Sequence, residues 1–287
     1  MNAAEDVLTV TEPEPELIVA PPVRRPMWRP GLGFLHPRMW LPLVLMLAVL
    51  ATLWTWGAHS MPYLLPPLGD IGDTLREDAD YYVNNAWVTL KEALMGLGLG
   101  LVAAFVLAVI TSEFPLARRA IMPVAVILNV TPLVAIAPAL VVAFGFGAAP
   151  KLIVTGLICF FPILINTSMG LRAVPQPVLQ VYRTVNASRL ETLWYIRIPM
   201  AMPYLFAALR IVFPLSVVGA VVAELSAAGS SEGLGTAISL ASSMNRLAAV
   251  YASIAILALL GSVLLLLVTA LERRVLHWHE SRQGNGG

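Results

Sequence analysis

The sequence predicts an all-α integral membrane protein with six transmembrane helices and with both the N and C termini in the cytoplasm. Three observations lead to this prediction. Of the 287 residues, 58% are hydrophobic and 12% are charged, whereas about a quarter of the residues in soluble domains are charged. Several apolar runs reach the roughly 20 residues that a helix needs to cross a bilayer. Most basic residues lie in the segments that six spans would place inside the cell.

Residues 1–38 are expected to form a Pro-rich, largely disordered cytoplasmic arm. This segment contains TEPEPE and APPVRRP and has few apolar side chains to bury. Its arginines precede the first apolar run, which places the arm inside the cell. The first transmembrane helix is predicted at 39–58, with Trp40, Trp54 and Trp56 near its ends as interfacial aromatic residues.

Residues 59–85 are expected to lie outside the cell because they are polar and net acidic, with Asp70, Asp73, Glu77, Asp78 and Asp80 against Arg76. The transmembrane core is predicted at 86–272. Its first helix, the second of the chain, runs from about Trp87 to Ile110. This helix contains GLGLG at 96–100, and small residues at this spacing predict close packing against another helix rather than a phosphate-binding loop.

The third apolar stretch, about 120–146, is predicted to be a broken helix. Asn129, Thr131, Pro132 and Pro138 interrupt it. Prolines and a buried amide leave backbone groups that a protein interior or a wet cavity must satisfy. We therefore expect this stretch to line a translocation path. A kinked helix that serves packing is the alternative interpretation.

The fourth transmembrane helix is expected to follow a short outer turn at 147–151 that includes Lys151. It carries Asn166 and Thr167 near its cytoplasmic end, where they either cap the helix or line a passage. Cys159 lies inside this apolar run. It is the one cysteine of the chain, so an intrachain disulfide is excluded and a small core residue is its expected role.

A polar, arginine-rich loop at 175–199 separates the fourth and fifth transmembrane helices and is predicted to be cytoplasmic. Ser188 and Glu191 have the spacing of a capping box, in which two side chains satisfy backbone N–H groups at the start of a helix. Asn186 stands just before them and tolerates the left-handed backbone that ends an incoming helix. The loop is therefore predicted to be a helix, a turn and a second helix.

The second helix of this loop is predicted to dock another protein. Leu190, Leu193 and Trp194 recur at i, i+3 and i+4, which places them in one apolar stripe. An apolar stripe in the cytoplasm must be covered. Pro199 is expected to end this helix because proline cannot donate the next helical hydrogen bond, and Pro203 suits the first turn of the helix that follows.

The fifth transmembrane helix is predicted at about 202–227, with Arg210 near its inner end and Glu224 near its outer end. A lone carboxylate in a membrane is costly unless it is paired or wet, so a functional role is favoured for Glu224. The segment 229–246 is too small and polar for a full span and suits a short re-entrant hairpin. The sixth helix, about 248–271, leads into a cytoplasmic tail at 273–287.

The basic residues support this topology when they are counted by position. Four of them (Arg76, Lys91, Lys151 and Arg246) fall outside, and Arg210 falls within a span. Thirteen fall inside, as the positive-inside rule requires: Arg24, Arg25, Arg29, Arg38, Arg118, Arg119, Arg172, Arg183, Arg189, Arg197, Arg273, Arg274 and Arg282.

The cytoplasmic loop resembles the EAA loop of bacterial ABC-importer permeases, whose pattern is E-A-A, three residues, glycine, nine residues and then I-x-L-P. Asn186 occupies the glycine position, Ile198 and Pro199 the terminal Leu-Pro, and Gln180, Val181 and Tyr182 the E-A-A positions. Further passages resemble the branch that imports sulfonates, taurine, nitrate and pyrimidine precursors. They are TPLVAIAPALVVAFGFGAAPK, FFPILINTSMGLRAV, VVAE and EGLG, and the likeness covers about 65–279.

The resemblance implies a transmembrane permease subunit of an ATP-driven ABC importer in the bacterial inner membrane. It implies a second permease chain in a homodimer, two cytoplasmic ATPase subunits, an external substrate-binding protein and a small organic solute. The loop would be the coupling helix, which docks the ATPase through Asn186, Ala187, Ser188, Arg189, Leu190, Glu191, Leu193, Trp194 and Pro199. The candidates for the translocation path are Asn129, Thr131, Pro132, Asn166 and Glu224.

The sequence gives little indication of a cofactor, a metal site, catalysis or nucleic-acid binding. Neither lysine, Lys91 or Lys151, lies in a Walker A loop, so no cofactor is expected on this chain, and ATP and Mg²⁺ would bind the partner ATPase. His277 and His279 lack a third convergent ligand, so a metal site is not expected. No catalytic motif is found, so the chain is not expected to be an enzyme. The net charge of +1 gives no indication of nucleic-acid binding.

The alternative function is a stand-alone ion-coupled carrier or channel. Such a protein would use Glu224 as a titrating group, and the second helix of the loop would lie on the membrane surface. Copurification separates the two hypotheses, because a carrier travels without an ATPase.

Overall fold

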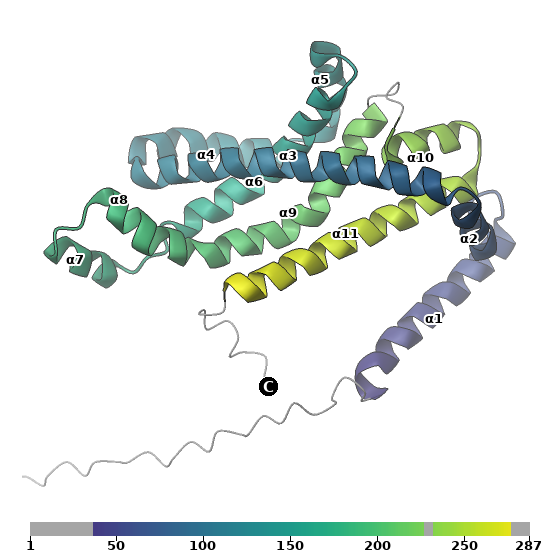
Figure 1. Cartoon of the computed structure of the whole chain (residues 1–287), viewed down its shortest axis with the longest axis horizontal. Helices are drawn as coiled ribbons and strands as arrows, with labels where there is room; N and C mark the ends of the chain where they lie inside the picture. The colour runs from purple at the N-terminus through teal and green to yellow at the C-terminus, as the bar shows by residue number, and fades with distance from the viewer. Residues whose placement is uncertain (1–36, 227–231, 277–287) are drawn as a thin grey trace, which may run out of the picture. The chain divides into compact units, whose positions relative to one another are not determined.

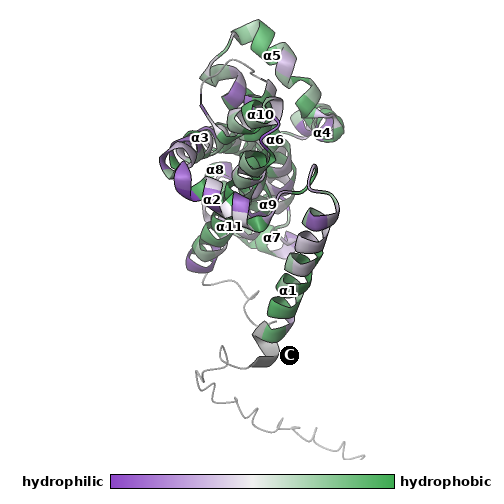
Figure 2. Ribbon diagram, turned by 90° about the vertical axis from the view of Figure 1, so that its right-hand side faces the viewer, coloured by the Kyte–Doolittle hydropathy of each residue, from purple (hydrophilic) through white to green (hydrophobic). Residues whose placement is uncertain are grey.

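The computed structural model describes residues 37–226 and 232–276, with side chains from residue 41 onward, and over these ranges it is all-helical. The chain divides into two units, residues 1–52 and 53–287. The first unit holds most of helix α1 (Pro37–Ser60), which covers the predicted span 39–58. Figure 2 shows the hydrophobic colouring of this helix. The predicted arm before it and most of the predicted tail, from residue 277 on, lie outside the described residues.

The second unit begins with a polar helix, α2 (Leu68–Glu77), and a long apolar helix, α3 (Ala79–Glu113). Helix α3 starts eight residues before the predicted start at Trp87. Its 35 residues correspond to roughly 52 Å at the helical rise, whereas the hydrocarbon core of a bilayer is about 30 Å thick. The predicted external segment is therefore largely helical, and α3 is long enough to extend beyond the membrane.

The third apolar stretch is broken, as predicted. It forms α4 (Pro115–Val130), a 3-10 turn (Leu133–Ala135) and α5 (Ala137–Phe144). The two helical parts are bent by 79°. Proline explains the break, because Pro132 at the bend cannot donate a helical hydrogen bond and disfavours helical angles at the residue before it, Thr131, whose backbone is extended.

The remaining elements alternate long apolar helices with short ones. They are α6 (Ala148–Gly170), α7 (Gln176–Thr184), α8 (Arg189–Thr192), a π-helix (Leu193–Arg197), α9 (Ile198–Ser226), α10 (Leu234–Ser243) and α11 (Leu247–Val275). Within the described residues, five helices are long and apolar enough to cross a membrane, and the bent α4–α5 pair brings the number to six if it counts as one span. The ten-residue α10 is too short to cross, as expected for the segment 229–246.

The prediction that Pro199 ends the docking helix is wrong. Helix α8 passes through the π-helix directly into α9, and Pro199 lies in the first turn of α9. The wider turn explains this continuity. The N–H of Ile198 donates to the carbonyl of Leu193, five residues back, and a wider turn of this kind admits the proline that follows it, which has no N–H to donate. Pro203 consequently lies inside α9, in its second turn.

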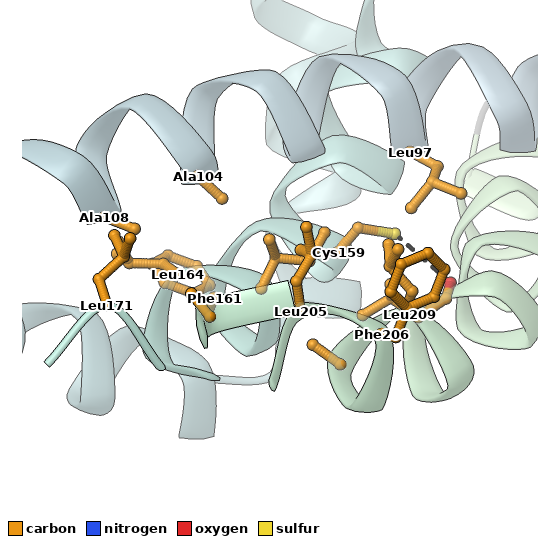
Figure 3. Close-up of a cluster of buried hydrophobic side chains, with 14 of the residues drawn as sticks. Leu97, Ala104, Ala108, Cys159, Phe161, Leu164, Leu171, Leu205, Phe206 and Leu209 are labelled. Carbon is orange, nitrogen blue, oxygen red and sulfur yellow. Dashed lines mark hydrogen bonds between the residues drawn. The ribbon is translucent and has the colours of Figure 1, made fainter. Parts of the chain in front are cut away.

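The core of the second unit lies between α3, α6 and α9, which run alongside one another (Figure 1). Figure 3 shows Cys159 among apolar side chains of this core, including Leu97, Phe206 and Leu209. Cys159 is fully buried, which confirms its predicted role as a small core residue.

The GLGLG run brings α3 into backbone contact with α6, as predicted. A β-carbon added to Gly96 would lie 2.5 Å from the Cβ of Thr155, and one added to Gly100 would lie 2.5 Å from the carbonyl oxygen of Gly156. Both distances are too short for any side chain. Gly98, between them, has nothing within 4 Å of the same position, so it faces away from α6.

These glycines give a matched pair of variants. Gly100→Ala is expected to lower the free energy of unfolding by about 1–3 kcal/mol, because overpacking must push two helix backbones apart. Gly98→Ala is expected to leave it unchanged or to raise it, since alanine is the better helix former by about 0.8–1.0 kcal/mol. Thermal unfolding of the purified chain in detergent measures both changes. Equal unfolding temperatures for the two variants would contradict the close contact.

Candidate functional site

The turn between α7 and α8 has the predicted left-handed residue. Asn186 has φ of 52°. The N–H of Asn186 donates to the carbonyl of Arg183 (3.1 Å), and the N–H of Ala187 donates to the carbonyl of Tyr182 (3.0 Å). This is the hydrogen-bond pattern with which a residue in left-handed conformation closes a helix C-terminus. Asparagine therefore performs the backbone role of the glycine in the family pattern.

The capping box at the start of α8 is confirmed. The backbone N–H of Ser188 donates to Oε2 of Glu191 (2.7 Å), and the N–H of Glu191 donates to Oγ of Ser188 (3.2 Å). Two N–H groups that a helix start leaves unpaired are thus satisfied by local side chains. Together with Asn186, this box fixes the geometry of the α7–α8 hairpin, defined here as residues 176–197.

The apolar stripe of the hairpin is divided between the surface and the core. Leu190 is 68% exposed and Trp194 is 65% exposed, whereas Leu193 is 7% exposed. The prediction that Leu193 belongs to the docking ridge is therefore wrong. Leu193 begins the π-helix that leads into α9 and packs in the core of the second unit. Other exposed apolar side chains of the hairpin, which the sequence did not indicate, are Val178, Val181, Val185 and Tyr195.

The other predicted docking residues lie at the surface, Pro199 just beyond the hairpin in α9 and the rest within the hairpin. Arg189, Glu191 and Pro199 are exposed, and Ala187 is half-buried. Figure 1 shows α7 and α8 at the opposite end of α9 from α10. The hairpin therefore offers an exposed apolar surface that includes Leu190 and Trp194, away from the packed helices.

An ion pair joins the hairpin to α3. A guanidinium nitrogen of Arg197, in the π-helix, lies 2.6 Å from Oε1 of Glu113, the last residue of α3. Both side chains are mostly buried, with 23% and 17% exposure. A second ion pair joins Arg210 of α9 to Glu272 of α11. The sequence predicts neither pair, because partners 84 and 62 residues apart leave no local pattern.

The candidate path residues are not brought together. Asn129 and Pro132 are exposed at the α4–α5 break, where the hydroxyl of Thr131 donates to the carbonyl of Ile127 (3.1 Å). The side-chain amide of Asn166 donates to the carbonyl of Pro162 in its own helix (2.8 Å). Among the described contacts, no hydrogen bond links these groups with each other or with Glu224. Asn166 therefore serves its own helix backbone.

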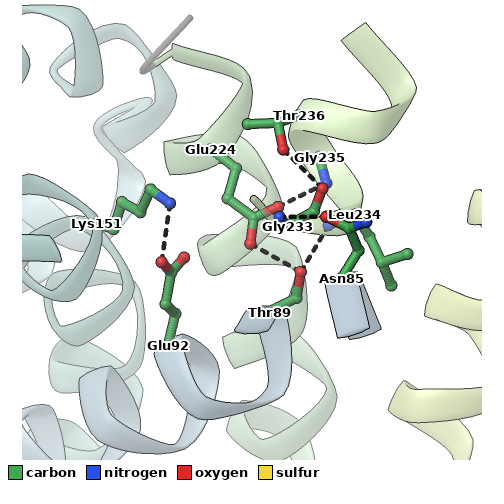
Figure 4. Close-up of polar contacts among 9 residues, drawn as sticks. All are labelled: Asn85, Thr89, Glu92, Lys151, Glu224, Gly233, Leu234, Gly235 and Thr236. Carbon is green, nitrogen blue, oxygen red and sulfur yellow. Dashed lines mark hydrogen bonds and ion pairs between the residues drawn. The ribbon is translucent and has the colours of Figure 1, made fainter. Parts of the chain in front are cut away.

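Glu224 binds the first turn of α10 (Figure 4). Its side chain is fully buried. One carboxylate oxygen accepts a hydrogen bond from the hydroxyl of Thr89 (2.8 Å), and the other accepts from the N–H of Gly235 (2.5 Å). A negative charge at a helix N-terminus is favourable because the unpaired N–H groups and the helix dipole both point at it.

Helix α3 supplies two further acceptors to the same turn. The hydroxyl of Thr89 accepts from the N–H of Leu234 (2.8 Å), and Oδ1 of Asn85 accepts from the N–H of Gly233 (2.7 Å). Asn85, Thr89 and Glu224 are named here the α10 clasp. Glycine is required at Gly233, where φ is 121° and an added β-carbon would lie 2.4 Å from the Glu224 carboxyl carbon. The contacts of the clasp thus explain why the sequence EGLG has glycine at positions 233 and 235.

A buried ion pair lies near the clasp in Figure 4. Nζ of Lys151 lies 2.8 Å from Oε1 of Glu92, and the two side chains are 5% and 13% exposed. The prediction that Lys151 lies in an outer turn is wrong. Lys151 is in the first turn of α6, which begins at Ala148, and Glu92 of α3 neutralises it there. No local sequence pattern indicates Glu92 as its partner.

Lys151→Met is expected to destabilise the chain by about 3–5 kcal/mol, because it leaves the carboxylate of Glu92 buried without its partner. The double variant Lys151→Met/Glu92→Leu removes both charges and is expected to regain most of that loss. Thermal unfolding in detergent compares the two variants. A double variant no more stable than the single one would show that the ion pair is not the cause.

The chain is similar to known membrane components of transport systems. The family of binding-protein-dependent transport system inner membrane components matches residues 96–277. A probable ABC transporter permease protein of Haemophilus influenzae is 36% identical over 195 residues, 67% of this chain and 79% of that protein. The formylaminopyrimidine transport permease protein ThiX of Halalkalibacterium halodurans is 30% identical, over 82% of this chain and 94% of ThiX.

The taurine transport system permease protein TauC of Escherichia coli is 29% identical, over 81% of this chain and 88% of TauC. The residues matched by the family, 96–277, include the hairpin, the broken α4–α5 pair, Glu224 of the clasp and α10. The chain belongs to the binding-protein-dependent transport system inner membrane components, and it is a permease subunit of an ABC importer.

Proposed function

We propose that two copies of this chain form the translocation path of an importer and that two cytoplasmic ATPase subunits drive it by binding the α7–α8 hairpin. The observation that carries this proposal is the exposure of Leu190 and Trp194 on a hairpin whose geometry is fixed by Asn186 and the capping box. Tryptophan is among the residue types that dominate binding energy at protein interfaces, and neighbouring contacts such as those of leucine exclude water from it.

The hairpin end of the second unit is proposed to face the cytoplasm of a bacterium, in the inner membrane. Basic side chains gather towards this end, as the positive-inside rule requires: Arg118, Arg119, Arg172, Arg183, Arg189 and Arg197. Helix α2, which carries Asp70, Asp73 and Glu77, would then lie outside. Both chain termini would be cytoplasmic with six spans.

The transported solute is proposed to be a small organic molecule that an external substrate-binding protein delivers. The relatives named above carry the names of taurine and formylaminopyrimidine transport. A sulfonate, taurine, nitrate or a pyrimidine precursor is therefore the expected class. Asn129, Thr131 and Pro132 are proposed to line the path, because the broken span leaves polar backbone that must face protein or water.

The alternative of an ion-coupled carrier is not favoured by the surroundings of Glu224. A titrating carrier residue must exchange its proton or ion with water. Glu224 is fully buried, and each of its carboxylate oxygens accepts a hydrogen bond. Its contacts are those of a group that positions α10.

Copurification tests the proposed function. The tagged full-length chain is extracted in mild detergent from its native host and purified. The expected result is a complex with an ATPase subunit in equal copy number and with ATP hydrolysis that vanadate inhibits. A chain that purifies as a dimer without any nucleotide-hydrolysing partner, and that still supports uptake in vesicles, would overturn the proposal.

A further inference from the structure

We propose that helix α3 is a lever that transmits movement of the α7–α8 hairpin to α10 on the other side of the membrane. Its two attachment points are the Arg197–Glu113 ion pair and the α10 clasp. This inference rests on the proposed function, since it assumes that an ATPase moves the hairpin. It assigns a positioning role to Glu113, Arg197 and Thr89, none of which lies on the docking surface.

The hairpin runs directly into α9 and contacts the other helices through few further points. Every residue of α7 and α8 is at least partly exposed. The buried contacts begin in the π-helix, where Leu193 and Ile196 are each 7% exposed. Arg197 follows at the end of this element and holds Glu113 at 2.6 Å. A displacement of the hairpin is therefore felt at the end of α3.

Helix α3 is built to move as a rigid body. It is continuous from Ala79 to Glu113 and contains no proline. Its closest contact is with α6 at Gly96 and Gly100, where added β-carbons would lie 2.5 Å from the Cβ of Thr155 and from the carbonyl oxygen of Gly156. Gly100 lies about 20 Å along the helix axis from Glu113 and about 16 Å from Thr89 at the helical rise. The glycine contact is thus a fulcrum near the middle of the lever.

The far end of the lever holds α10. Thr89 and Asn85 accept hydrogen bonds from the N–H groups of Leu234 and Gly233, and Thr89 also donates to Glu224. These bonds attach the first turn of α10 to both α3 and α9. Because α10 is only ten residues long, a tilt of α3 acts on a short element whose first backbone N–H groups are bound by α3 side chains.

The experiment reports the position of α10 by cysteine labelling. Ser243→Cys places a thiol on the exposed C-terminal end of α10, and the buried Cys159 is retained. The complete complex with its ATPase is reconstituted in vesicles. The rate of reaction with a membrane-impermeant maleimide is measured with ADP and with ATP plus vanadate. A chain without Ser243→Cys gives the background. Hydrolysis of ATP is measured in the same samples.

The nucleotide is expected to change the labelling rate on the order of 10-fold, within the range of typical coupling between distant sites. Arg197→Gln and Glu113→Gln should abolish this change while ATP hydrolysis continues. The charge exchange Glu113→Arg/Arg197→Glu should restore it. Thr89→Val, which keeps the side-chain shape, should abolish the nucleotide-dependent change in labelling rate, because it breaks the clasp at the other end of α3. The matched control is Arg119→Gln, an exposed arginine near the start of α4, which should behave as the unaltered complex does.

Persistence of the nucleotide effect in both Arg197→Gln and Thr89→Val would overturn the lever. Loss of the effect in the charge exchange, with hydrolysis intact, would also overturn it, because the ion pair would then not be the link. If the proposed function itself were wrong, the results would differ from these. In that case the unaltered chain would bind no ATPase and would show no vanadate-sensitive hydrolysis.

Discussion

Leu190→Asp/Trp194→Asp is expected to abolish the binding of the ATPase subunit and with it ATP-driven uptake. The two side chains are 68% and 65% exposed, so the chain itself loses little stability when they become polar. A buried anchor residue at a protein interface contributes 2 kcal/mol or more, and two charges placed in an apolar pocket add an unpaired desolvation cost. Affinity should therefore fall by roughly 1,000-fold or more.

Copurification of the ATPase and ATP hydrolysis by the assembled complex measure this effect. Tyr63→Asp is the matched control, because Tyr63 is 76% exposed and lies between α1 and α2, far along the chain from the hairpin. Leu193→Asp serves as a contrast, since it places a charge in the chain's own core and should lower the unfolding temperature. Unaltered hydrolysis in the Leu190/Trp194 variant would refute docking through the hairpin.

Glu224→Ala is expected to detach α10 from its neighbours and to lower the free energy of unfolding by about 3–5 kcal/mol. The substitution removes the acceptor of two buried hydrogen bonds, each worth about 1.5–3 kcal/mol when one partner is charged. It leaves the N–H of Gly235 unpaired. Glu224→Gln should cost less, because its amide oxygen can accept from the N–H of Gly235 while its NH₂ group can donate to the hydroxyl of Thr89.

Thermal unfolding in detergent ranks these variants. The matched control is Glu232→Ala, because Glu232 is an exposed glutamate two residues before the first residue of α10. It should unfold at the temperature of the unaltered chain. If Glu224→Ala unfolded at the same temperature as Glu232→Ala, the clasp would not hold α10.

The sequence predicted the features that depend on neighbouring residues. The capping box at Ser188, the left-handed turn at Asn186 and the close contact of Gly96 and Gly100 each follow from short spacings with one physical meaning. The break at Pro132 follows from the chemistry of proline. The membrane class follows from composition, which needs no knowledge of contacts at all.

The features that the sequence did not predict are pairings across the fold. Thr89 meets Glu224 and Glu92 meets Lys151 although 135 and 59 residues separate the partners. Nothing in a single sequence specifies which polar group lies opposite. Leu193 was misplaced for a related reason. The spacing of a stripe shows which residues share a face, but the direction of that face depends on how α8 is joined to α9.

That join is the π-helix at Leu193–Arg197, and it has a geometric consequence. A turn closed by a bond to the fifth residue back holds one residue more than an ordinary helical turn. Each residue of a helix rotates the chain by roughly 100°. The angular position of Leu190 around the axis of α9 is therefore set by the number of residues in this join. The direction in which Leu190 faces the proposed ATPase subunit thus depends on the length of the join rather than on its side chains.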